Sequence, residues 1–238
     1  MKPATQDQET TTASGATLTS LAVDRLRNDI LGGTFTPSTR LRIDELKARY
    51  GVGGSPMREA LSRLVSEGLV DSLNQKGFRV APVSAEDLLD ITETRQSLEG
   101  TAIERAIERG DDVWEGNVLG AFHRLEKYLN RNPEINATML PEWEEIHAHF
   151  HRTLISACGS PRLTTFCQQL YNQGTRYRHL LQDYNFASRD LIAEHRDLVD
   201  AVLSRDAGRA RSVLEQHLAL TADIILSTET DIIEGAPF

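Results

Sequence analysis

One stretch of the sequence, residues 51–83, constrains the fold more than any other because a helix start and a hairpin pattern follow each other there. A tight Gly-Val-Gly-Gly turn precedes Ser55, a preferred helix N-cap, and Pro56, which is favoured at the first helical position. Apolar residues then recur at the spacing of one helix face, at Met57, Leu61, Leu64 and Val65. This pattern predicts an amphipathic helix that ends near Gly68.

Two short strand-like runs, residues 69–73 and 78–83, follow this helix. The Asn-Gln-Lys-Gly turn between them predicts a hairpin. Apolar spacing and the glycines that come after it predict two earlier helices, over residues 18–31 and 43–50. The order helix, helix, turn, helix, hairpin is that of a winged helix-turn-helix, in which the third helix enters the major groove and the hairpin forms the wing.

The rest of the sequence has helical periodicity and no strand pattern or internal repeat. Six helices are predicted, at about residues 85–109, 112–130, 139–158, 161–182, 187–204 and 206–228. The fold is therefore predicted to be mainly α, with an N-terminal winged helix-turn-helix and a C-terminal all-α antiparallel bundle, a fold that builds ligand and metal sites from facing helices. We expect a disordered polar tail over residues 1–18, a DNA-binding domain over 19–83, and a sensing and dimerisation domain over 84–238.

The net charge of −9 is distributed unevenly along the chain. Residues 19–83 hold 10 basic and 7 acidic side chains, a balance of +3, whereas residues 84–238 hold 15 and 26, a balance of −11. This asymmetry indicates that only the first part meets phosphate. No apolar run approaches the roughly 20 residues that span a bilayer, and the N-terminus lacks the apolar segment of a secretory signal, so we expect a cytoplasmic protein without a membrane partner.

The two cysteines, Cys158 and Cys167, form no CxxC pair. In a chain of this type they are expected to be reduced thiols, with a redox-sensing pair as the alternative.

The candidate DNA-binding residues are polar, basic or small side chains on the helix-turn-helix and at the wing tip. They are Arg42, Lys47, Ser55, Pro56, Arg58, Ser62, Lys76 and Gly77. A recognition helix needs a small N-terminus, so that the backbone can approach the groove, and polar side chains in its first turns that reach phosphates or base edges. The alternative is that these basic side chains form the solvated surface of a protein-interaction module.

The stretch GVGGSPMREALSRLVSEGLV, followed by NQKGFRV, resembles GntR-type transcriptional regulators. The later stretches ETRQSLEG, FHRTLISACGSPRL and AEHRDLVDAVLSRDAGRARSVLEQHL resemble the FCD (FadR C-terminal domain) subfamily, and the details NQKG and CGSPRL are similar to its carbon-starvation-induced repressor branch. The resemblance implies a homodimeric repressor on a palindromic DNA operator, with Arg58 contacting DNA and Gly77 at the wing tip. It also implies that the chain is not an enzyme.

The sequence departs from this family before the recognition helix. Where the family often has Ser-Arg, this chain has Gly53-Gly54, so one DNA-contacting arginine is missing. A family consensus operator is therefore not expected to apply to this chain.

Four of the seven histidines lie on or beside inward-facing apolar stripes of the predicted bundle. They are His147, His151, His195 and His217. His147 and His151 are four residues apart and project from one helix face, whereas His149 points to the other side. Histidine is the commonest metal ligand, and several together suit zinc, nickel, cobalt or copper. The alternative is four hydrogen-bonded histidines in the core.

The resemblance to FCD domains strengthens the metal hypothesis, because metal-binding members place one Asp and three His at these stations. His151, His195 and His217 match the three histidines, and the Asp station falls on His147. A four-histidine site is richer in nitrogen and less anionic, so zinc is expected as the ion, with nickel as the second choice and manganese disfavoured. A purely structural ion is also compatible with the pattern.

The resemblance further implies that the C-terminal domain binds a small organic acid. Arg95 matches a family arginine that faces the cavity, and Arg178 is a weaker candidate for binding the carboxylate. The alternative for Arg95 is an i, i+4 salt bridge with Glu99. Binding of the acid would shift the population of dimer conformations away from the one whose recognition helices match the operator, which would release the DNA.

Two other functions are compatible with parts of the pattern. A metal-free regulator could bind a larger ligand such as an acyl-CoA, although it would have no need of the four histidines. A metal-dependent hydrolase would need a general base, and Glu144, three residues before His147, is expected to be exposed rather than aimed at the metal. No nucleophile motif and no phosphate-binding loop is present.

Overall fold

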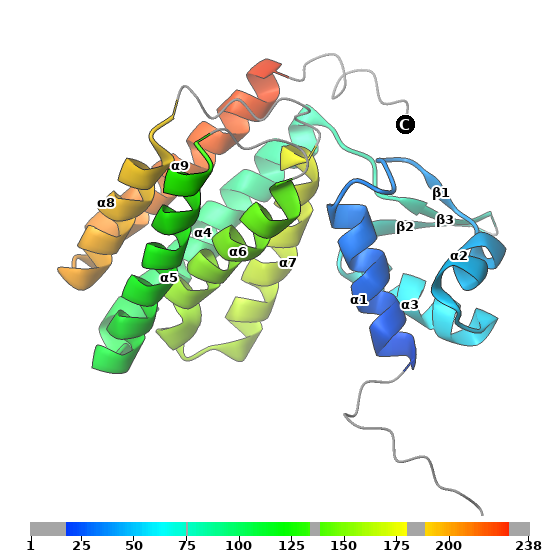
Figure 1. Cartoon of the computed structure of the whole chain (residues 1–238), viewed down its shortest axis with the longest axis horizontal. Helices are drawn as coiled ribbons and strands as arrows, with labels where there is room; N and C mark the ends of the chain where they lie inside the picture. Colours follow the sequence, from blue (N-terminus) through cyan, green and yellow to red (C-terminus); the bar gives the residue numbers. More distant parts are fainter. Residues whose placement is uncertain (1–17, 75, 134–138, 180–188, 229–238) are drawn as a thin grey trace, which may run out of the picture.

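The computed structural model describes residues 18–74, 76–133, 139–179 and 189–228, which form a winged-helix domain and a helical bundle (Figure 1). The predicted tail lies outside the described residues except for Leu18, which begins the first helix. The N-terminal elements are α1 (Leu18–Leu31), β1 (Arg40–Leu41), α2 (Ile43–Tyr50), α3 (Gly54–Ser66), β2 (Val70–Leu73) and β3 (Gly77–Val80). This order confirms the predicted winged helix-turn-helix.

The wing is part of a three-stranded antiparallel sheet with the order β1-β3-β2. In the hairpin, Leu73 faces Gly77 across the turn. The sequence did not predict β1, whose Arg40 and Leu41 pair with Arg79 and Phe78 of β3. Two residues are too few to show the alternation by which a strand is recognised, so this strand exists only through its pairing.

The recognition helix α3 begins earlier than predicted. Its N-cap is Gly53 rather than Ser55, because the Gly53 carbonyl already accepts the first helical hydrogen bond, from the Met57 amide at 3.1 Å. No side chain caps this helix. Pro56 lies within the first turn, where its missing N–H has no helical partner to lose.

The C-terminal domain is an all-helical bundle. Its elements are α4 (Ala85–Arg109), α5 (Asp112–Arg131), α6 (Leu140–Ile155), the 3-10 turn η1 (Ser156–Cys158), α7 (Pro161–Arg178), α8 (Leu191–Leu203) and α9 (Ala207–Thr228). Several of these helices begin at a Ser or Asp whose side chain accepts the amide hydrogen three residues later. These N-caps are Ser84, Asp111, Ser160 and Asp190.

Two predicted helix boundaries were wrong. The helix predicted to reach residue 158 ends at Ile155 and gives way to η1. The helix predicted from residue 187 begins at Leu191, because Asp190 is its N-cap. Residues 180–188, where the sequence predicted the end of one helix and the start of the next, lie outside the described residues.

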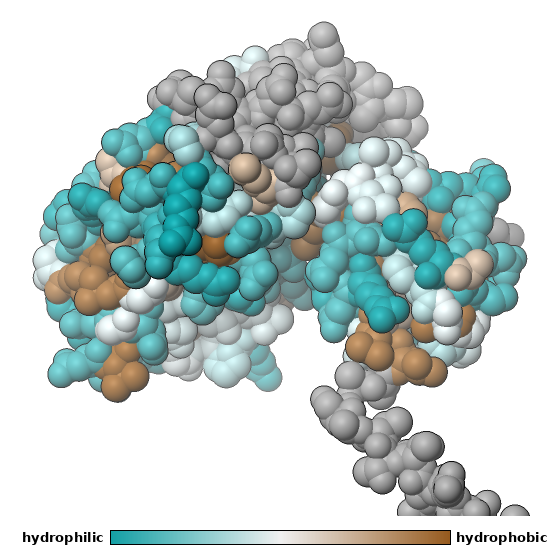
Figure 2. All heavy atoms as spheres, viewed as in Figure 1, coloured by the Kyte–Doolittle hydropathy of each residue, from teal (hydrophilic) through white to brown (hydrophobic). Residues whose placement is uncertain are grey.

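Each part has its own hydrophobic core. One core is built from residues between Ala22 and Val80, and the other from residues between Val83 and Ile225. In Figure 1, α7 is the bundle helix next to α1 of the winged-helix domain, and residues of these two helices are in contact. Figure 2 shows a mainly hydrophilic face on both lobes, with apolar side chains in small, separate patches. Within the described part of the chain, no helix is long and apolar enough to cross a membrane.

Candidate functional site

The candidate DNA-binding residues lie on the recognition helix, the preceding helix and the wing. Ser55, Arg58 and Ser62 are exposed on α3, and Lys76 and Gly77 are exposed at the wing tip. Among the described residues, Arg58 forms no ion pair, so its guanidinium is available to a phosphate or a base edge.

Two candidate cations, Arg42 at the N-cap of α2 and Lys47 within it, are partly neutralised by acidic residues of this helix. Arg42 pairs with Glu45 at 3.2 Å, and Lys47 pairs with Asp44 at 3.0 Å. Both pairs are solvent-exposed and therefore weak, so a phosphate can replace either carboxylate.

Sequence reasoning missed one residue of the wing. Arg40 donates a hydrogen bond from Nη2 to the Lys76 carbonyl at 2.9 Å and so ties the wing tip to β1. The only signal would have been β1 itself, which the sequence did not reveal.

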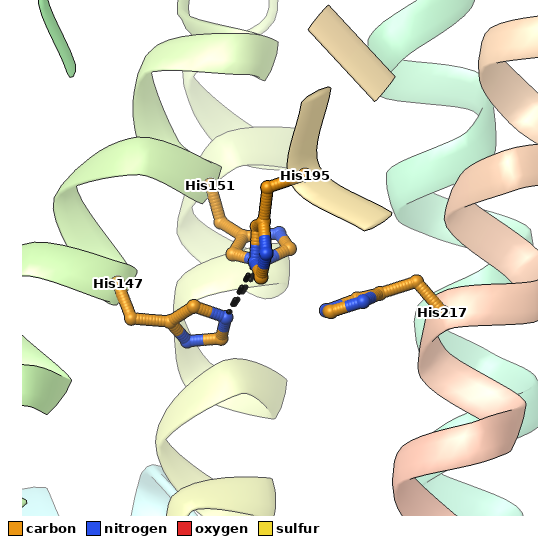
Figure 3. Close-up of side chains that lie close together, drawn as sticks. All are labelled: His147, His151, His195 and His217. Carbon is orange, nitrogen blue, oxygen red and sulfur yellow. Dashed lines mark hydrogen bonds between the residues drawn. The ribbon is translucent and has the colours of Figure 1, made fainter. Parts of the chain in front are cut away.

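The four predicted histidines converge in the bundle (Figure 3). His147 and His151 come from α6, His195 from α8 and His217 from α9, and one nitrogen from each lies within 4.8 Å of the others. The Nε2 atom of His147 lies 3.1 Å from Nε2 of His195 and 3.1 Å from Nε2 of His151. All four residues are buried. His149 lies outside this cluster, as expected.

The second ring nitrogen of three histidines is fixed by a hydrogen bond. His195 Nδ1 lies 2.6 Å from the Leu191 carbonyl, which can only accept, and His217 Nδ1 lies 3.0 Å from the Glu194 carboxylate. His147 Nδ1 lies 2.8 Å from the Tyr171 hydroxyl. These partners hold the proton on Nδ1, which leaves a lone pair on each Nε2.

The Tyr171 hydroxyl can accept this hydrogen bond because it donates its own proton to Glu144 Oε2 at 3.2 Å. The lone pairs of His147 and His195 then face each other at 3.1 Å without a proton between them. A bound cation would replace this repulsion with coordination by the histidine nitrogens. The four residues therefore fit a transition-metal ion with nitrogen ligands, as the donor chemistry of zinc or nickel requires.

The protonation of the cluster favours metal binding. Burial, and next the neighbouring histidines, hold the pKa of His147 and His151 well below the ordinary value. Burial also lowers the pKa of His195 to about 3 and, against the opposing effect of Glu194, lowers the pKa of His217. The imidazoles are therefore neutral near pH 7, which is the form that binds a metal.

A small cavity adjoins the cluster. It has a volume of about 30 Å³ and is lined by His147 and His217 together with three arginines. These are Arg95 of α4, Arg178 of α7 and Arg189, which precedes α8. The first two were predicted from the sequence, and Arg189 was missed because nothing in its neighbourhood marks it as buried.

Each of the three arginines has a carboxylate partner. Arg178 donates two hydrogen bonds to Glu144, at 2.8 and 2.7 Å. Arg189 pairs with Glu194, and Arg95 Nε donates to Glu99 at 2.7 Å. Arg95 thus forms the i, i+4 pair that was its alternative role, and it also lines the cavity, while its part in binding an acid stays a prediction.

The expectation that Glu144 is exposed was wrong. Its carboxylate is buried because Arg178 and Tyr171 surround it. Burial by itself would raise the pKa of Glu144, but the Arg178 guanidinium outweighs burial and lowers it. The carboxylate is thus engaged by its neighbours and does not have the freedom of a general base.

The two cysteines are buried thiols. Burial, followed by the negative charge of Glu99, raises the pKa of the Cys167 thiol to about 12. A thiol that stays protonated at neutral pH is a poor redox sensor, which favours the prediction of reduced thiols over a redox-sensing pair.

A winged helix-turn-helix joined to a helical bundle with a buried polar cavity defines the class of one-component DNA-binding regulators. Residues 18–80 match the family model described as bacterial regulatory proteins, gntR family, and residues 90–220 match the FCD domain model. The chain belongs to the GntR family of transcriptional regulators, and its C-terminal part is an FCD domain.

Two relatives are similar over most of the chain. The HTH-type transcriptional repressor GlaR of Escherichia coli (strain K12) is 40% identical over 88% of this chain and 96% of its own length. The HTH-type transcriptional regulator BphR of Paraburkholderia xenovorans (strain LB400) is 37% identical, over 90% of this chain and 87% of its own. The chain is thus a DNA-binding transcriptional regulator and not an enzyme, which removes the hydrolase alternative.

Solved structures share the fold. Escherichia coli McbR/YncC superposes with a TM-score of 0.76 at 21% identity, covering 90% of this chain and 99% of that one. A GntR regulator from Rhodococcus sp. RHA1 gives a TM-score of 0.71 at 22% identity, covering 88% of this chain and 97% of that one. At this identity the likeness concerns the fold alone.

Proposed function

We propose that this regulator is a repressor that releases its DNA when a small organic acid binds beside a zinc ion held by His147, His151, His195 and His217. The repressor role is supported by the similarity to a named repressor, GlaR. The convergence of four neutral imidazoles around one point supports the ion. Nickel is the second choice, because it shares the preference for imidazole nitrogen.

One observation carries the acid-binding part of the proposal. Arg95 is 6% exposed, donates from Nε to Glu99, and has no hydrogen-bond partner for Nη1 or Nη2 among the described residues. A buried guanidinium with two free donor groups beside a cavity is a site for a carboxylate. Position 174 of α7, which also lines the cavity, is a glycine, and a Cβ there would lie 3.4 Å from Arg95 Nη1 and 4.0 Å from Arg178 Nη1.

The size of the cavity favours a small acid over an acyl-CoA. A volume of about 30 Å³ is on the scale of a few water molecules. It can receive a carboxylate group, whereas drug-sized ligands occupy pockets of roughly 300–1,000 Å³. A larger ligand would have to displace the walls of this cavity.

We propose that the DNA partner is a palindromic operator bound by a homodimer in the cytoplasm. Arg58 and Ser62 lie one turn apart on the exposed side of α3, where they can reach one major groove, and a second copy supplies the second half-site. Gly53 and Gly54 leave the start of this helix bare, so the operator of this chain has to be selected afresh from a random DNA pool.

A thermal-shift screen with small mono- and dicarboxylates tests the acid site, using protein as isolated and after chelation. A ligand at 100 times its Kd adds about 2.7 kcal/mol to the folded state. Arg95→Lys keeps the charge next to Glu99 but loses the planar fork, so it should abolish the shift. Arg105→Lys, an exposed position on the same helix, is the matched control. A shift that survives in Arg95→Lys, or the absence of any shift in the unmodified protein, would contradict the proposal.

A further inference from the structure

Helix α7 presents two functional faces. Gly174 and Arg178, four residues apart, line the cavity of the proposed effector site. Gln173, Arg176 and Tyr177 have the spacing of a second face and bind the DNA-binding domain and the connection to it. The same helix is therefore a wall of the cavity and a support of the winged helix.

Gln173 contacts the end of the recognition helix. Its Nε2 atom donates to the carbonyl of Glu67, the C-cap residue of α3, at 2.9 Å. The carbonyls of the last helical turn have no partner inside the helix, so this bond satisfies one of them. The contact is close, since a Cβ at Gly68 would lie 2.5 Å from the same Nε2 atom.

Arg176 and Tyr177 hold the segment between the wing and the bundle. Arg176 is buried and donates from Nη1 to the carbonyl of Ala81, directly after β3, at 3.0 Å. The Tyr177 hydroxyl accepts from the Ser84 amide at 3.2 Å and donates to Asp87 at 2.5 Å. α7 is thus hydrogen-bonded to the end of the recognition helix and to the segment that follows the wing.

We propose that α7 transmits occupancy of the cavity to the recognition helix, with Gln173 as the coupling residue. This inference rests on the proposed acid and metal site. An acid larger than the cavity of about 30 Å³ has to displace one of the helices that line it. One of these is α7, which is hydrogen-bonded to the end of α3 through Gln173. Metal loading acts on the same helix, because His147 is bonded to Tyr171 of α7 at 2.8 Å.

Hydrogen exchange at the end of α3 tests this coupling. The amides of Glu67, Gly68 and Leu69 donate to Arg63, Val65 and Leu64 and report whether the last turn is held. The variant Gln173→Met keeps the side-chain length and removes the donor. The control Gln169→Met lies one turn earlier on α7, and Gln169 has no hydrogen bond among the described residues.

Two arms are measured by mass spectrometry, without metal and with ZnCl₂. Without metal, Gln173→Met should speed exchange at these amides about two- to tenfold, the effect of losing one hydrogen bond, and Gln169→Met should not. With zinc, the wild type and the control should change their exchange there, whereas Gln173→Met should respond at most half as much with the same calorimetric zinc affinity.

The outcomes separate this inference from the proposed function. Equal exchange in Gln173→Met and Gln169→Met without metal would overturn the coupling role whatever the site binds. Zinc binding with an undiminished response in Gln173→Met, or with no response in the wild type, would also overturn it. Failure of zinc to bind the wild type would contradict the proposed metal centre instead, and the metal-free arm would still decide whether Gln173 holds the recognition helix.

Discussion

Glu194 accepts a hydrogen bond from Nδ1 of His217 at 3.0 Å, so a residue adjacent to one candidate ligand in the sequence orients another on a different helix. Burial would raise the pKa of Glu194, but the hydrogen bonds from His217 and Arg189 outweigh it and lower the pKa to about 2. The carboxylate is ionised throughout the physiological range and keeps the Nδ1 proton on His217.

The first prediction follows from this contact. Glu194→Gln should weaken zinc binding about 10- to 100-fold, because partners that orient metal ligands have effects of this size. Competition with a chelating dye measures the affinity. Glu126→Gln, which removes the carboxylate that pairs with Arg196 at the surface, is the control and should bind zinc like the wild type. Equal affinities in the two variants would show that Glu194 does not support the site.

The second prediction concerns the choice of metal. His147→Asp should lower the preference for zinc over manganese by about a factor of ten, the equivalent of 1.4 kcal/mol, because a carboxylate suits the harder ion. Calorimetric titration with both ions gives the ratio. His149→Asp adds the same charge to α6 outside the cluster and should leave the ratio unchanged. A ratio that moves equally in both variants would mean that only the added charge matters.

The third prediction concerns DNA. Arg58→Ala should weaken binding to an operator duplex selected with the wild type and reduce the slope of log K against log salt by about 1 if the contact is to a phosphate. Fluorescence anisotropy over a salt series measures both quantities. Arg105→Ala, exposed on α4 of the bundle, is the control. Wild-type affinity in Arg58→Ala would remove this residue from the interface.

The fourth prediction concerns pH. The buried histidines have a lower pKa in the folded protein than in the unfolded chain, so the unfolded chain binds more protons as the pH falls below about 6.5. The metal-free protein should therefore lose stability with acidification, by at most about 1.4 kcal/mol per pH unit for each histidine.

Urea unfolding between pH 7.5 and 5 measures this loss. For His195, whose pKa is lowered to about 3, the loss of stability continues from the unfolded pKa of about 6.5 down to about pH 3, so His195→Gln should flatten the measured profile. His123→Gln, an exposed histidine on α5, should keep the wild-type profile. Equal slopes in the two variants would show that His195 does not titrate in this way.

The sequence predicted those parts of the molecule that depend on local patterns. Helical periodicity and glycine stops located the helix-turn-helix, and the i, i+4 spacing of His147 and His151 placed both on one face. Turn chemistry located the hairpin, whose turn ends at Gly77. These features depend on neighbours within a few residues, which is why one sequence was enough to find them.

The features that were missed or misjudged depend on distant parts of the chain. β1 exists because Arg40 and Leu41 pair with β3, which lies about 40 residues later in the sequence. A pattern of two residues cannot predict such a pairing. Glu144 was expected to be exposed, but Arg178 arrives from another helix and buries it. Arg189 likewise lines the cavity beside Thr221, which comes 32 residues later in the chain.

The pairing of Arg95, Arg178 and Arg189 with Glu99, Glu144 and Glu194 has a consequence for the resting state of the regulator. The pocket is close to electroneutral by itself, so the bundle can fold without a bound anion to compensate buried cations. The acid that we propose would therefore not fill a charge vacancy; it would bind the Nη groups of Arg95, which Glu99 leaves free. The protein is therefore stable without the acid, as the proposed release of DNA on acid binding requires.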